Sequence, residues 1–389
     1  MAIEHTISSV QQDSKKLIVH WDDQHQSVFH YLWLRDNCRC VDCGEPALGR
    51  KQFRITDVPL DLRLESVVVK DARRIEVVWE NDRHKSTYTA QWLRQYCYSE
   101  RARAQRRHRP VLWDSRIAKD LPQVNYAAVL ATDAERLRML GRVRDYGFCL
   151  VKNVPPRRGE LETFAASLGV IVETDSGRIF EILLKSGEDI KSVAHLNSDL
   201  IPHHDDSYRT TFPSIIFFHC LVAGDNGSGQ SVYVDGLQIA ECLRREEPEA
   251  FALLSHYAVP FCKQQGGQIH MQARSPLIHL DSEGNITGVR ISNLFVAPLD
   301  LPEMIVEPFY RAYRKLMDYY TARQYQLMLD LCPGDLIILD NHRVLHGRTT
   351  INAENQDRHL RHCYGDRDYL YSQWRTLNQS RALHTLEDQ

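Results

Sequence analysis

Short apolar runs separated by turns dominate the sequence from about residue 200 onward, and they constrain the fold more than any other feature. Their length and their β-branched and aromatic composition are typical of strands buried in a sheet. Helical stretches interrupt them near residues 236–256 and 303–322. Many short strands with intervening turns indicate two packed sheets or a closed barrel. We therefore expect a mainly β fold with helices, in the form of a two-sheet jelly-roll barrel. The runs are SIIFFHCLVA, QSVYVDG, QYQLMLDL and DLIILDN.

A chain of 389 residues is long for one domain and suits two. Residues 16–35 and 74–80 alternate apolar and polar side chains, which predicts short antiparallel strands and a small β domain over residues 1–100. Residues 101–125 are basic and lack periodicity, so we expect a linker there whose charges are solvated. The jelly-roll domain then covers residues 126–389.

Two helices are expected at the start of the second domain, each ended by a glycine. Residues 133–146 precede Gly147, residues 158–168 precede Gly169, and a glycine just past the last periodic residue is a common helix stop. The apolar run FCLVKNV between them predicts a strand.

The charge and hydropathy of the chain exclude several classes of partner. The formal net charge is −3, from 48 basic and 51 acidic side chains, so no strong field of one sign attracts nucleic acid or an anionic membrane. The N-terminal segment lacks the apolar run of a signal peptide, and no later run is long enough to span a membrane. We expect a cytoplasmic protein that acts on a small molecule.

Three of the ten cysteines crowd into a Cys-x-Cys-x-x-Cys motif formed by Cys38, Cys40 and Cys43. Three thiolates within six residues suit one tetrahedral soft metal ion better than three unrelated buried thiols. His84, in the turn NDRH after an expected strand, is the candidate for the fourth ligand. Four protein ligands leave no open coordination position, so we expect a structural Zn(II) site.

A second metal signature combines the run IPHHDDSYR with the distant segment DNHRVLHGR. A histidine and a carboxylate two residues apart on an extended strand point to the same side and can hold one cation. The doubled sequence allows two registers, and spacing does not choose between them. These are His203 with Asp205 and His204 with Asp206. His346 supplies a third ligand, and two histidines with one carboxylate leave positions open, as iron(II) oxygenases require for a co-substrate and dioxygen.

Arg358, twelve residues beyond His346, is the candidate anchor for that co-substrate. Its guanidinium can form a planar, bidentate pair with a carboxylate, as the far carboxylate of 2-oxoglutarate requires. Taken alone, a surface ion pair with the neighbouring Glu354 or Asp357 is the simpler interpretation of Arg358.

Together these motifs resemble the γ-butyrobetaine hydroxylase family, which includes trimethyllysine hydroxylase and belongs to the wider taurine dioxygenase-like group. The resemblance runs over nearly the whole chain. It implies a double-stranded β-helix, often a homodimer, that uses Fe(II), 2-oxoglutarate and dioxygen and contains a structural Zn(II). The matching segments are YLWLRDNCRCVDC, HKSTYTAQWL, HHDDSYR, FFHCL, SVYVDG, PGDLIILDNHRVLHGR and DRHLRHCYGDRD.

The resemblance also assigns roles to individual residues. The HTDNPYR-like run of the family aligns with residues 203–209, which selects the first register and leaves His204 and His342 outside the iron ligands. No catalytic side chain is implied beyond the metal ligands. The residues implied are His203, Asp205 and His346 for iron, Cys38, Cys40, Cys43 and His84 for zinc, and Arg358 and Ser231 for 2-oxoglutarate.

The substrate pocket departs from the family pattern. Family members enclose a trimethylammonium group in aromatic rings, whose faces attract the cation. Two of the four matching positions in this chain lack a ring suited to a cation. The four positions are Ser176 and His195, where Tyr is usual, and Phe180 and Tyr364; Ser192 replaces an Asn expected near the anionic end of the substrate.

The resemblance implies hydroxylation of an unactivated C–H bond, coupled to decarboxylation of 2-oxoglutarate to succinate, without a general base. The first hypothesis is a small trimethylammonium substrate such as γ-butyrobetaine. The second is the same chemistry on another amine, such as 2-(trimethylammonio)ethylphosphonate or another aminophosphonate, or a pathway-specific amino acid. A third, a metal-stabilised binding or sensor protein, is disfavoured by the complete set of iron ligands. The ligands do not fix hydroxylation against desaturation.

Overall fold

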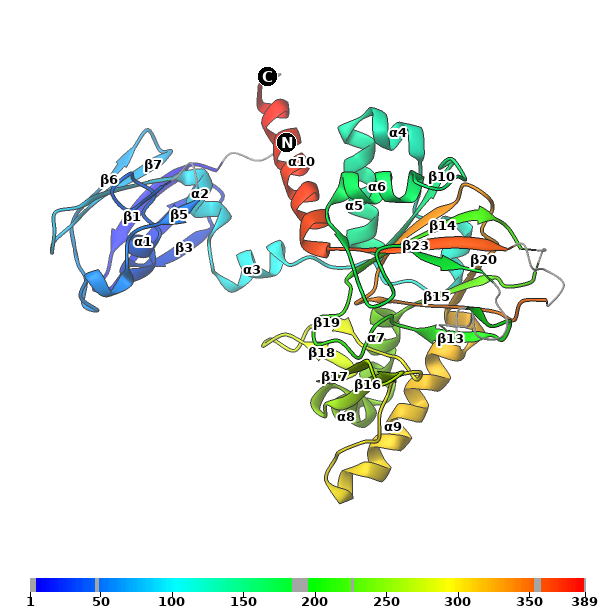
Figure 1. Cartoon of the computed structure of the whole chain (residues 1–389). Helices are drawn as coiled ribbons and strands as arrows, with labels where there is room; N and C mark the ends of the chain where they lie inside the picture. The colour runs from blue at the N-terminus through cyan, green and yellow to red at the C-terminus, as the bar shows by residue number, and fades with distance from the viewer. Residues whose placement is uncertain (1–4, 46–48, 184–194, 225–226, 353–357, 388–389) are drawn as a thin grey trace. The chain divides into compact units, whose positions relative to one another are not determined.

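The computed structural model describes residues 5–45, 49–183, 195–224, 227–352 and 358–387. The chain folds into two compact units, Met1–His108 and Arg109–Gln389 (Figure 1). No helix among the described residues is long and apolar enough to cross a membrane.

The boundary between the units lies inside the expected linker of residues 101–125, and most of that segment is not a linker. Residues 109–125 belong to the second unit because they carry apolar side chains that pack there. Trp113 is buried against Phe148, with ring centroids 5.1 Å apart, and its indole N–H donates to the Tyr146 carbonyl at 2.7 Å. The basic composition therefore suggested a solvated linker, although one large apolar side chain, Trp113, packs this segment against the second unit.

The first unit is built on two three-stranded antiparallel sheets and a shared apolar core. Residues 31–36, expected to continue a strand, form helix α1 instead, because Tyr31 and Leu34 lie three residues apart and both enter the core. The strands are β1 (Ile7–Gln12), β2 (Lys16–Trp21), β3 (Gln26–His30), β4 (Gly44–Glu45), β5 (Arg50–Lys51), β6 (Leu64–Lys70), β7 (Arg74–Trp79) and β8 (Lys85–Thr89), and the helices are α1 (Tyr31–Asp36), α2 (Ala90–Gln95) and α3 (Glu100–Arg106).

The second unit contains a larger, mixed sheet and a smaller, antiparallel sheet. The larger sheet has the order β11-β23-β14-β21-β10-β9, with β12 also paired to β23, and it is mixed because β9 runs parallel to β10. The smaller sheet has the order β13-β22-β15-β20. The larger sheet comprises β9 (Gln123–Asn125), β10 (Phe148–Lys152), β11 (Ile171–Val172), β12 (Phe180–Ile182), β14 (Ile215–Val222), β21 (Leu336–Asp340) and β23 (His359–Gly365); the smaller comprises β13 (Leu200–His203), β15 (Ser231–Asp235), β20 (Gln326–Leu329) and β22 (Val344–Arg348).

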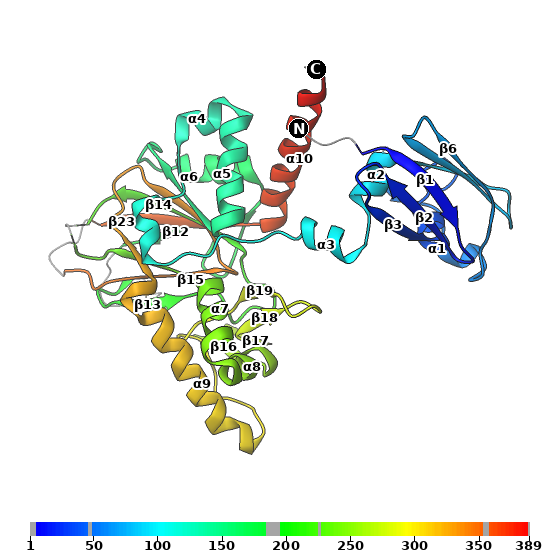
Figure 2. The same ribbon diagram turned by 180° about the vertical axis from the view of Figure 1, so that it is seen from behind.

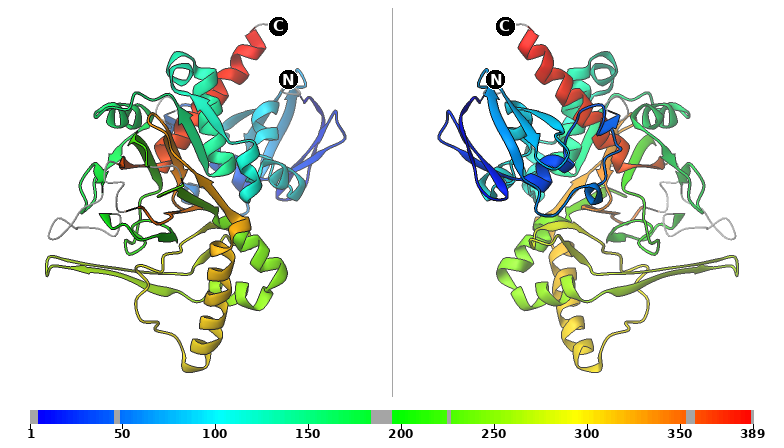
Figure 3. Two further views of the ribbon diagram at one scale, coloured as in Figure 1. Left: turned by 90° about the vertical axis from the view of Figure 1, so that its right-hand side faces the viewer. Right: turned by 90° about the vertical axis from the view of Figure 1, so that its left-hand side faces the viewer.

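Helices cover the outer faces of this arrangement. One group packs its apolar side chains on the larger sheet, and another packs around a second core that includes two hairpins (Figure 2). Figure 3 shows the longer of these hairpins in profile. The first group is α4 (Tyr126–Ala131), α5 (Asp133–Tyr146), α6 (Glu160–Leu168) and α10 (Arg367–Glu387); the second is α7 (Gly236–Glu246), α8 (Pro248–His256) and α9 (Glu303–Thr321); the hairpins are β16 (Val259–Gln265) with β17 (Ile269–Ser275) and β18 (Ile278–Leu280) with β19 (Ile286–Val289).

Local sequence explains why several elements lie where they were expected. Helix α5 begins after Thr132, whose hydroxyl accepts from the Glu135 N–H, and ends at Gly147, whose φ of 80° suits a residue without a side chain. Strands β10, β14, β15, β20 and β21 fall on the expected apolar runs. The expected helix at residues 236–256 is two helices, because Pro248 starts α8.

Candidate active site

Two histidines meet across neighbouring strands of the smaller sheet. His203 is the last residue of β13 and pairs directly with His346 on the antiparallel strand β22. Their ring centroids are 4.7 Å apart, and both side chains are buried. The Nδ1 atom of His203 lies 2.9 Å from the Ile201 carbonyl, a contact that requires a proton on Nδ1 and leaves Nε2 as the free donor for a metal.

Asp205 completes the cluster from a turn beyond the end of β13, and not from the strand itself as the spacing suggested. Its Oδ1 lies 3.4 Å from Nε2 of His203 and 3.5 Å from Nε2 of His346. The three ligand atoms all lie within 4.8 Å of one another. Two imidazole nitrogens and one carboxylate oxygen converging in this way fit Fe(II) and leave coordination positions open.

The charges of these side chains favour a metal. Burial alone would raise the pKa of Asp205, but the imidazoles of His346 and His203 hold it well below its usual range, so the carboxylate is ionised. Burial lowers the pKa of His346, which keeps its imidazole neutral and able to donate a lone pair.

The alternative register does not converge on a common point. His204 is fully buried, and its Nδ1 accepts from the Ile291 N–H at 2.9 Å. The Asp206 carboxylate accepts from the Tyr208 hydroxyl at 2.6 Å and from Nε of Arg209 at 2.8 Å. His342 packs against Phe212, with ring centroids 4.2 Å apart, and does not line the pocket that contains the cluster.

A pocket of about 350 Å³ lies between the two sheets and contains the three candidate ligands in its wall. Both sheets contribute to it, so the candidate site depends on their packing. The smaller sheet supplies His203, Ser231, Tyr233, His346 and Arg348, and the larger supplies Phe180, Phe218, Leu360, His362 and Tyr364.

Arg358 also lines this pocket and is only 6% exposed. Burial lowers the pKa of its guanidinium, but an arginine so placed remains charged. No carboxylate of the described residues forms an ion pair with it, and Glu354 and Asp357 lie outside those residues. Ser231 lines the same pocket from β15.

The expected substrate residues are only partly brought together. Ser176, Phe180 and Tyr364 line the pocket, whereas His195 is buried outside its lining and stacks on Phe180, with centroids 5.2 Å and planes 3° apart. The Tyr364 hydroxyl donates to Oδ2 of Asp205 at 2.9 Å, a contact that the sequence did not suggest. Ser192 lies outside the described residues.

Sequence reasoning missed several pocket residues, among them Tyr208, Lys263, Phe295 and His362. Lys263 reaches the pocket from the β16–β17 hairpin, and its Nζ donates to Asp175 at 2.6 Å. Asp175 also pairs with Arg209, so one carboxylate is shared by two cations. No local motif marks Lys263, because its neighbours come from distant segments. Tyr208 and His362 lie in the family-like segments HHDDSYR and DRHLRHCYGDRD, which could have pointed to them.

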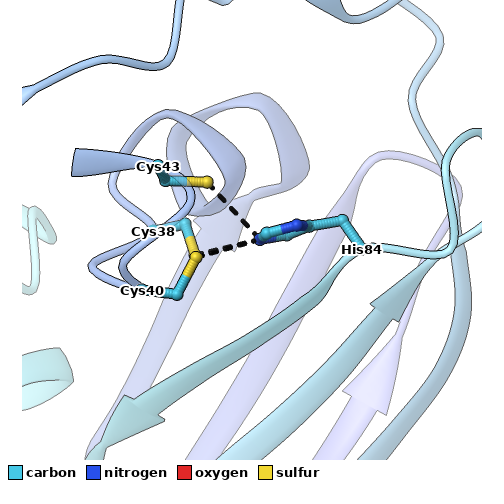
Figure 4. Close-up of side chains that lie close together, drawn as sticks. All are labelled: Cys38, Cys40, Cys43 and His84. Carbon is cyan, nitrogen blue, oxygen red and sulfur yellow. Dashed lines mark hydrogen bonds between the residues drawn. The ribbon is translucent and has the colours of Figure 1, made fainter.

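The first unit contains a second cluster of donors, in which Cys38, Cys40 and Cys43 surround His84 (Figure 4). Their Sγ atoms lie 3.4, 3.5 and 3.4 Å from Nε2 of His84. The cysteines follow α1, and His84 lies in the turn between β7 and β8. Three sulfurs and one imidazole nitrogen in one compact group fit a tetrahedral zinc ion with no open position.

Arg35 connects the two halves of this cluster. Its Nη1 donates to Cys43 Sγ at 3.1 Å and its Nη2 donates to Asp82 at 3.2 Å. The other oxygen of Asp82 accepts from the His84 N–H at 3.0 Å. One buried cation therefore contacts a candidate ligand sulfur and, through Asp82, helps to place the turn that carries the histidine.

Comparisons with known proteins agree with this geometry. Residues 106–364 match the family described as taurine catabolism dioxygenase TauD, TfdA family, and residues 8–94 match the one described as gamma-butyrobetaine hydroxylase-like, N-terminal. The chain belongs to the TauD/TfdA dioxygenase family and is a non-haem iron, 2-oxoglutarate-dependent dioxygenase. The resemblance found in the sequence is thus confirmed.

Three relatives match over most of their length. The gamma-butyrobetaine dioxygenase of Pseudomonas sp. (strain AK-1) is 34% identical over 360 residues, covering 91% of each chain. The gamma-butyrobetaine dioxygenase of Homo sapiens is 27% identical, covering 92% of this chain and 93% of that protein. The trimethyllysine dioxygenase of Meyerozyma guilliermondii is 27% identical, covering 97% of each.

The register is tested by comparing His203→Ala with His204→Ala. We expect His203→Ala to lose bound Fe(II) and turnover, because it removes a metal ligand, and His204→Ala to retain measurable activity. Because His204 is buried, iron should be measured per folded protein, with circular dichroism as the folding check. Loss of iron in the His204 variant, with retention in the His203 variant, would place the ligands one residue later.

The cysteine cluster predicts about one zinc per chain, in a site distinct from iron. We expect Cys40→Ser to reduce zinc content and soluble yield more than the activity of the surviving folded enzyme, because a structural zinc contributes to folding. Cys332→Ser, which changes an exposed cysteine, is the matched control. Elemental analysis that finds no zinc in well-folded wild-type protein would contradict the prediction.

Proposed function

We propose that this dioxygenase hydroxylates an unactivated C–H bond of a small trimethylammonium compound such as γ-butyrobetaine. In this proposal His203, Asp205 and His346 hold Fe(II), while Arg358 and Ser231 hold 2-oxoglutarate. The observation that carries it is the shared pocket: the three convergent donors and a buried arginine line one space between the sheets. The names of the relatives support the substrate class.

Bound Fe(II), with 2-oxoglutarate and dioxygen, supplies the oxidising chemistry that such a C–H bond requires. The protein positions the reactants. Arg358 offers a bidentate partner to the far carboxylate of 2-oxoglutarate, in a buried setting where a charged hydrogen bond is strong. The walls from both sheets limit where the substrate can lie, and no side chain is needed as a general base.

Aromatic side chains on the pocket wall support a cationic substrate. Phe180, Tyr208, Phe295 and Tyr364 all line the pocket, and ring faces attract a desolvated trimethylammonium. Tyr208 and Phe295 lie edge to face, with centroids 4.7 Å apart, at positions not considered from the sequence. They supply rings that Ser176 and His195 do not.

A second candidate is the same chemistry on a more strongly anionic amine, such as 2-(trimethylammonio)ethylphosphonate or another aminophosphonate, or on a pathway-specific amino acid. Lys263 is the observation that favours it, because this lysine lines the pocket from β16, a different element from the segment that carries Arg358. A cation there would attract a carboxylate or phosphonate end. Ser176, which is exposed beside the pocket, leaves room for a polar group.

Three further properties are part of the proposal. The cysteine cluster with His84 holds one structural Zn(II), supported by its four convergent donors. The chain forms a homodimer and acts in the cytoplasm, both by analogy with the family that the sequence resembles.

Arg358→Ala should raise the 2-oxoglutarate concentration needed for half-maximal turnover by about tenfold or more, because loss of one partner of a desolvated charged pair typically costs about 2–5 kcal/mol. Succinate formation at varied 2-oxoglutarate measures this. Arg311→Ala is the matched control, since that guanidinium is 76% exposed and pairs with Glu307 on α9. An unchanged 2-oxoglutarate requirement would place the carboxylate anchor on another residue.

The substrate is tested by measuring substrate-dependent succinate formation with γ-butyrobetaine and with 5,5-dimethylhexanoate, its carbon isostere, in which an uncharged tert-butyl group replaces the trimethylammonium. We expect the betaine to have a KM lower by about 2–30-fold, because each desolvated cation–aromatic contact contributes about 0.5–2 kcal/mol. Aminophosphonates and amino acids complete the panel. Stimulation by one of these, with none by any trimethylammonium carboxylate, would replace the first candidate with the second.

A further inference from the structure

The pairing of β13 with β22 fixes two of the three candidate iron ligands but not the third. His203 and His346 lie opposite each other within the smaller sheet. Asp205 lies in the turn after β13, where no strand partner fixes its backbone. Because a metal site tolerates only small displacements of its ligands, other contacts must place this carboxylate.

The side chain of Asn341 holds the backbone of Asp205 in both directions. Its Oδ1 accepts from the Asp205 N–H at 3.1 Å, and its Nδ2 donates to the Asp205 carbonyl at 3.2 Å and to the Pro213 carbonyl at 2.8 Å. Asn341 is fully buried and directly follows β21 of the larger sheet. The backbone N–H of Asn341 donates to the Ser214 carbonyl at 2.8 Å. Because its backbone is held in this way, the side-chain amide has little freedom to move.

The hydroxyl of Tyr364 holds the carboxylate of Asp205. It donates to Oδ2 at 2.9 Å, while Oδ1 faces the Nε2 atoms of His203 and His346. Tyr364 lies on β23 of the larger sheet, where it pairs with Ile216 on one side and Val172 on the other. The two carboxylate oxygens therefore have different partners: Oδ2 accepts from the tyrosine hydroxyl, and Oδ1 faces the two histidines.

We propose that Asn341 and Tyr364 are positioning residues that clamp Asp205 as a one-oxygen ligand of iron, with the Tyr364 hydroxyl keeping Oδ2 off the metal. This rests on the proposed iron site. Tyr364 lies on β23 of the larger sheet and Asn341 directly follows β21 of the same sheet, whereas both histidines belong to the smaller sheet. The clamp therefore ties the metal site across the two sheets, and the Tyr364 ring at the same time forms part of the substrate wall.

The hydroxyl and ring roles of Tyr364 can be separated by Tyr364→Phe, which keeps the ring and removes the donor. We expect the dissociation constant for Fe(II), measured anaerobically on zinc-loaded protein without substrate, to rise by about 10–100-fold, as is typical when an outer partner of a metal ligand is lost. Uncoupled 2-oxoglutarate decarboxylation should rise relative to coupled turnover, while the KM for γ-butyrobetaine changes less than the Fe(II) affinity.

Tyr371→Phe is the matched control. It also removes a partly buried tyrosine hydroxyl that donates to a carboxylate, that of Asp340 at 3.3 Å, but neither residue lines the pocket. We expect it to leave the Fe(II) affinity within about twofold of wild type, below the effect typical of an outer metal partner. Asn341→Asp keeps the shape of the side chain and removes the Nδ2 donor, and should also weaken Fe(II) binding.

The outcomes separate the clamp from the proposed function. Wild-type Fe(II) affinity in Tyr364→Phe would overturn the clamp and leave the iron site intact. Wild-type protein that binds no Fe(II) would overturn both. Failure of every trimethylammonium compound in turnover would overturn the proposed substrate alone, because Fe(II) binding is measured without it and still decides the clamp.

Discussion

The close approach of β13 and β22 sets His203 opposite His346, and the candidate active site depends on that approach. Gly347 permits it. A Cβ atom at residue 347 would lie 2.3 Å from the Leu200 carbonyl oxygen and 2.9 Å from the Pro202 nitrogen, so no other residue fits without moving the strand. The glycine of the His-Gly-Arg segment therefore allows the backbones of β13 and β22 to lie close together. This close approach brings the imidazoles of His203 and His346 into contact.

The metal site is also a junction between sheets. The histidines come from the smaller sheet, Asp205 is held by Asn341 and Tyr364 from the larger sheet, and the pocket lies between them. Buried charges of both signs line this space. Asp205 is ionised at the candidate metal position, and Arg358, which has no carboxylate partner among the described residues, lies where an anionic co-substrate is proposed. Such charges are costly when buried alone, and a bound cation and a bound carboxylate offset that cost.

The sequence predicted what local pattern determines. Apolar runs marked the strands, Gly147 marked the end of α5, and compact spacing marked the cysteine cluster. The sequence did not predict contacts between residues that are far apart along the chain. Asn341 and Tyr364 reach Asp205 over 136 and 159 positions of chain, and Lys263 reaches Asp175 over 88, so no periodicity signals these contacts. His195 aligns with a position where the family has Tyr, yet it stacks on Phe180 outside the pocket lining, because side-chain direction depends on tertiary packing. Residues 31–36 were predicted to be a strand because a short helix and a short strand bury similar apolar residues, so the sequence pattern does not distinguish them.

Anomalous diffraction from crystals grown anaerobically with Fe(II), recorded on both sides of the iron and zinc absorption edges, tests the central assignment most directly. One iron peak is predicted in the pocket between the sheets, bonded to Nε2 of His203, Nε2 of His346 and a single oxygen of Asp205. One zinc peak is predicted among the three cysteines and His84. An iron peak beside His204 and Asp206, or no iron in the pocket of folded protein, would contradict the account.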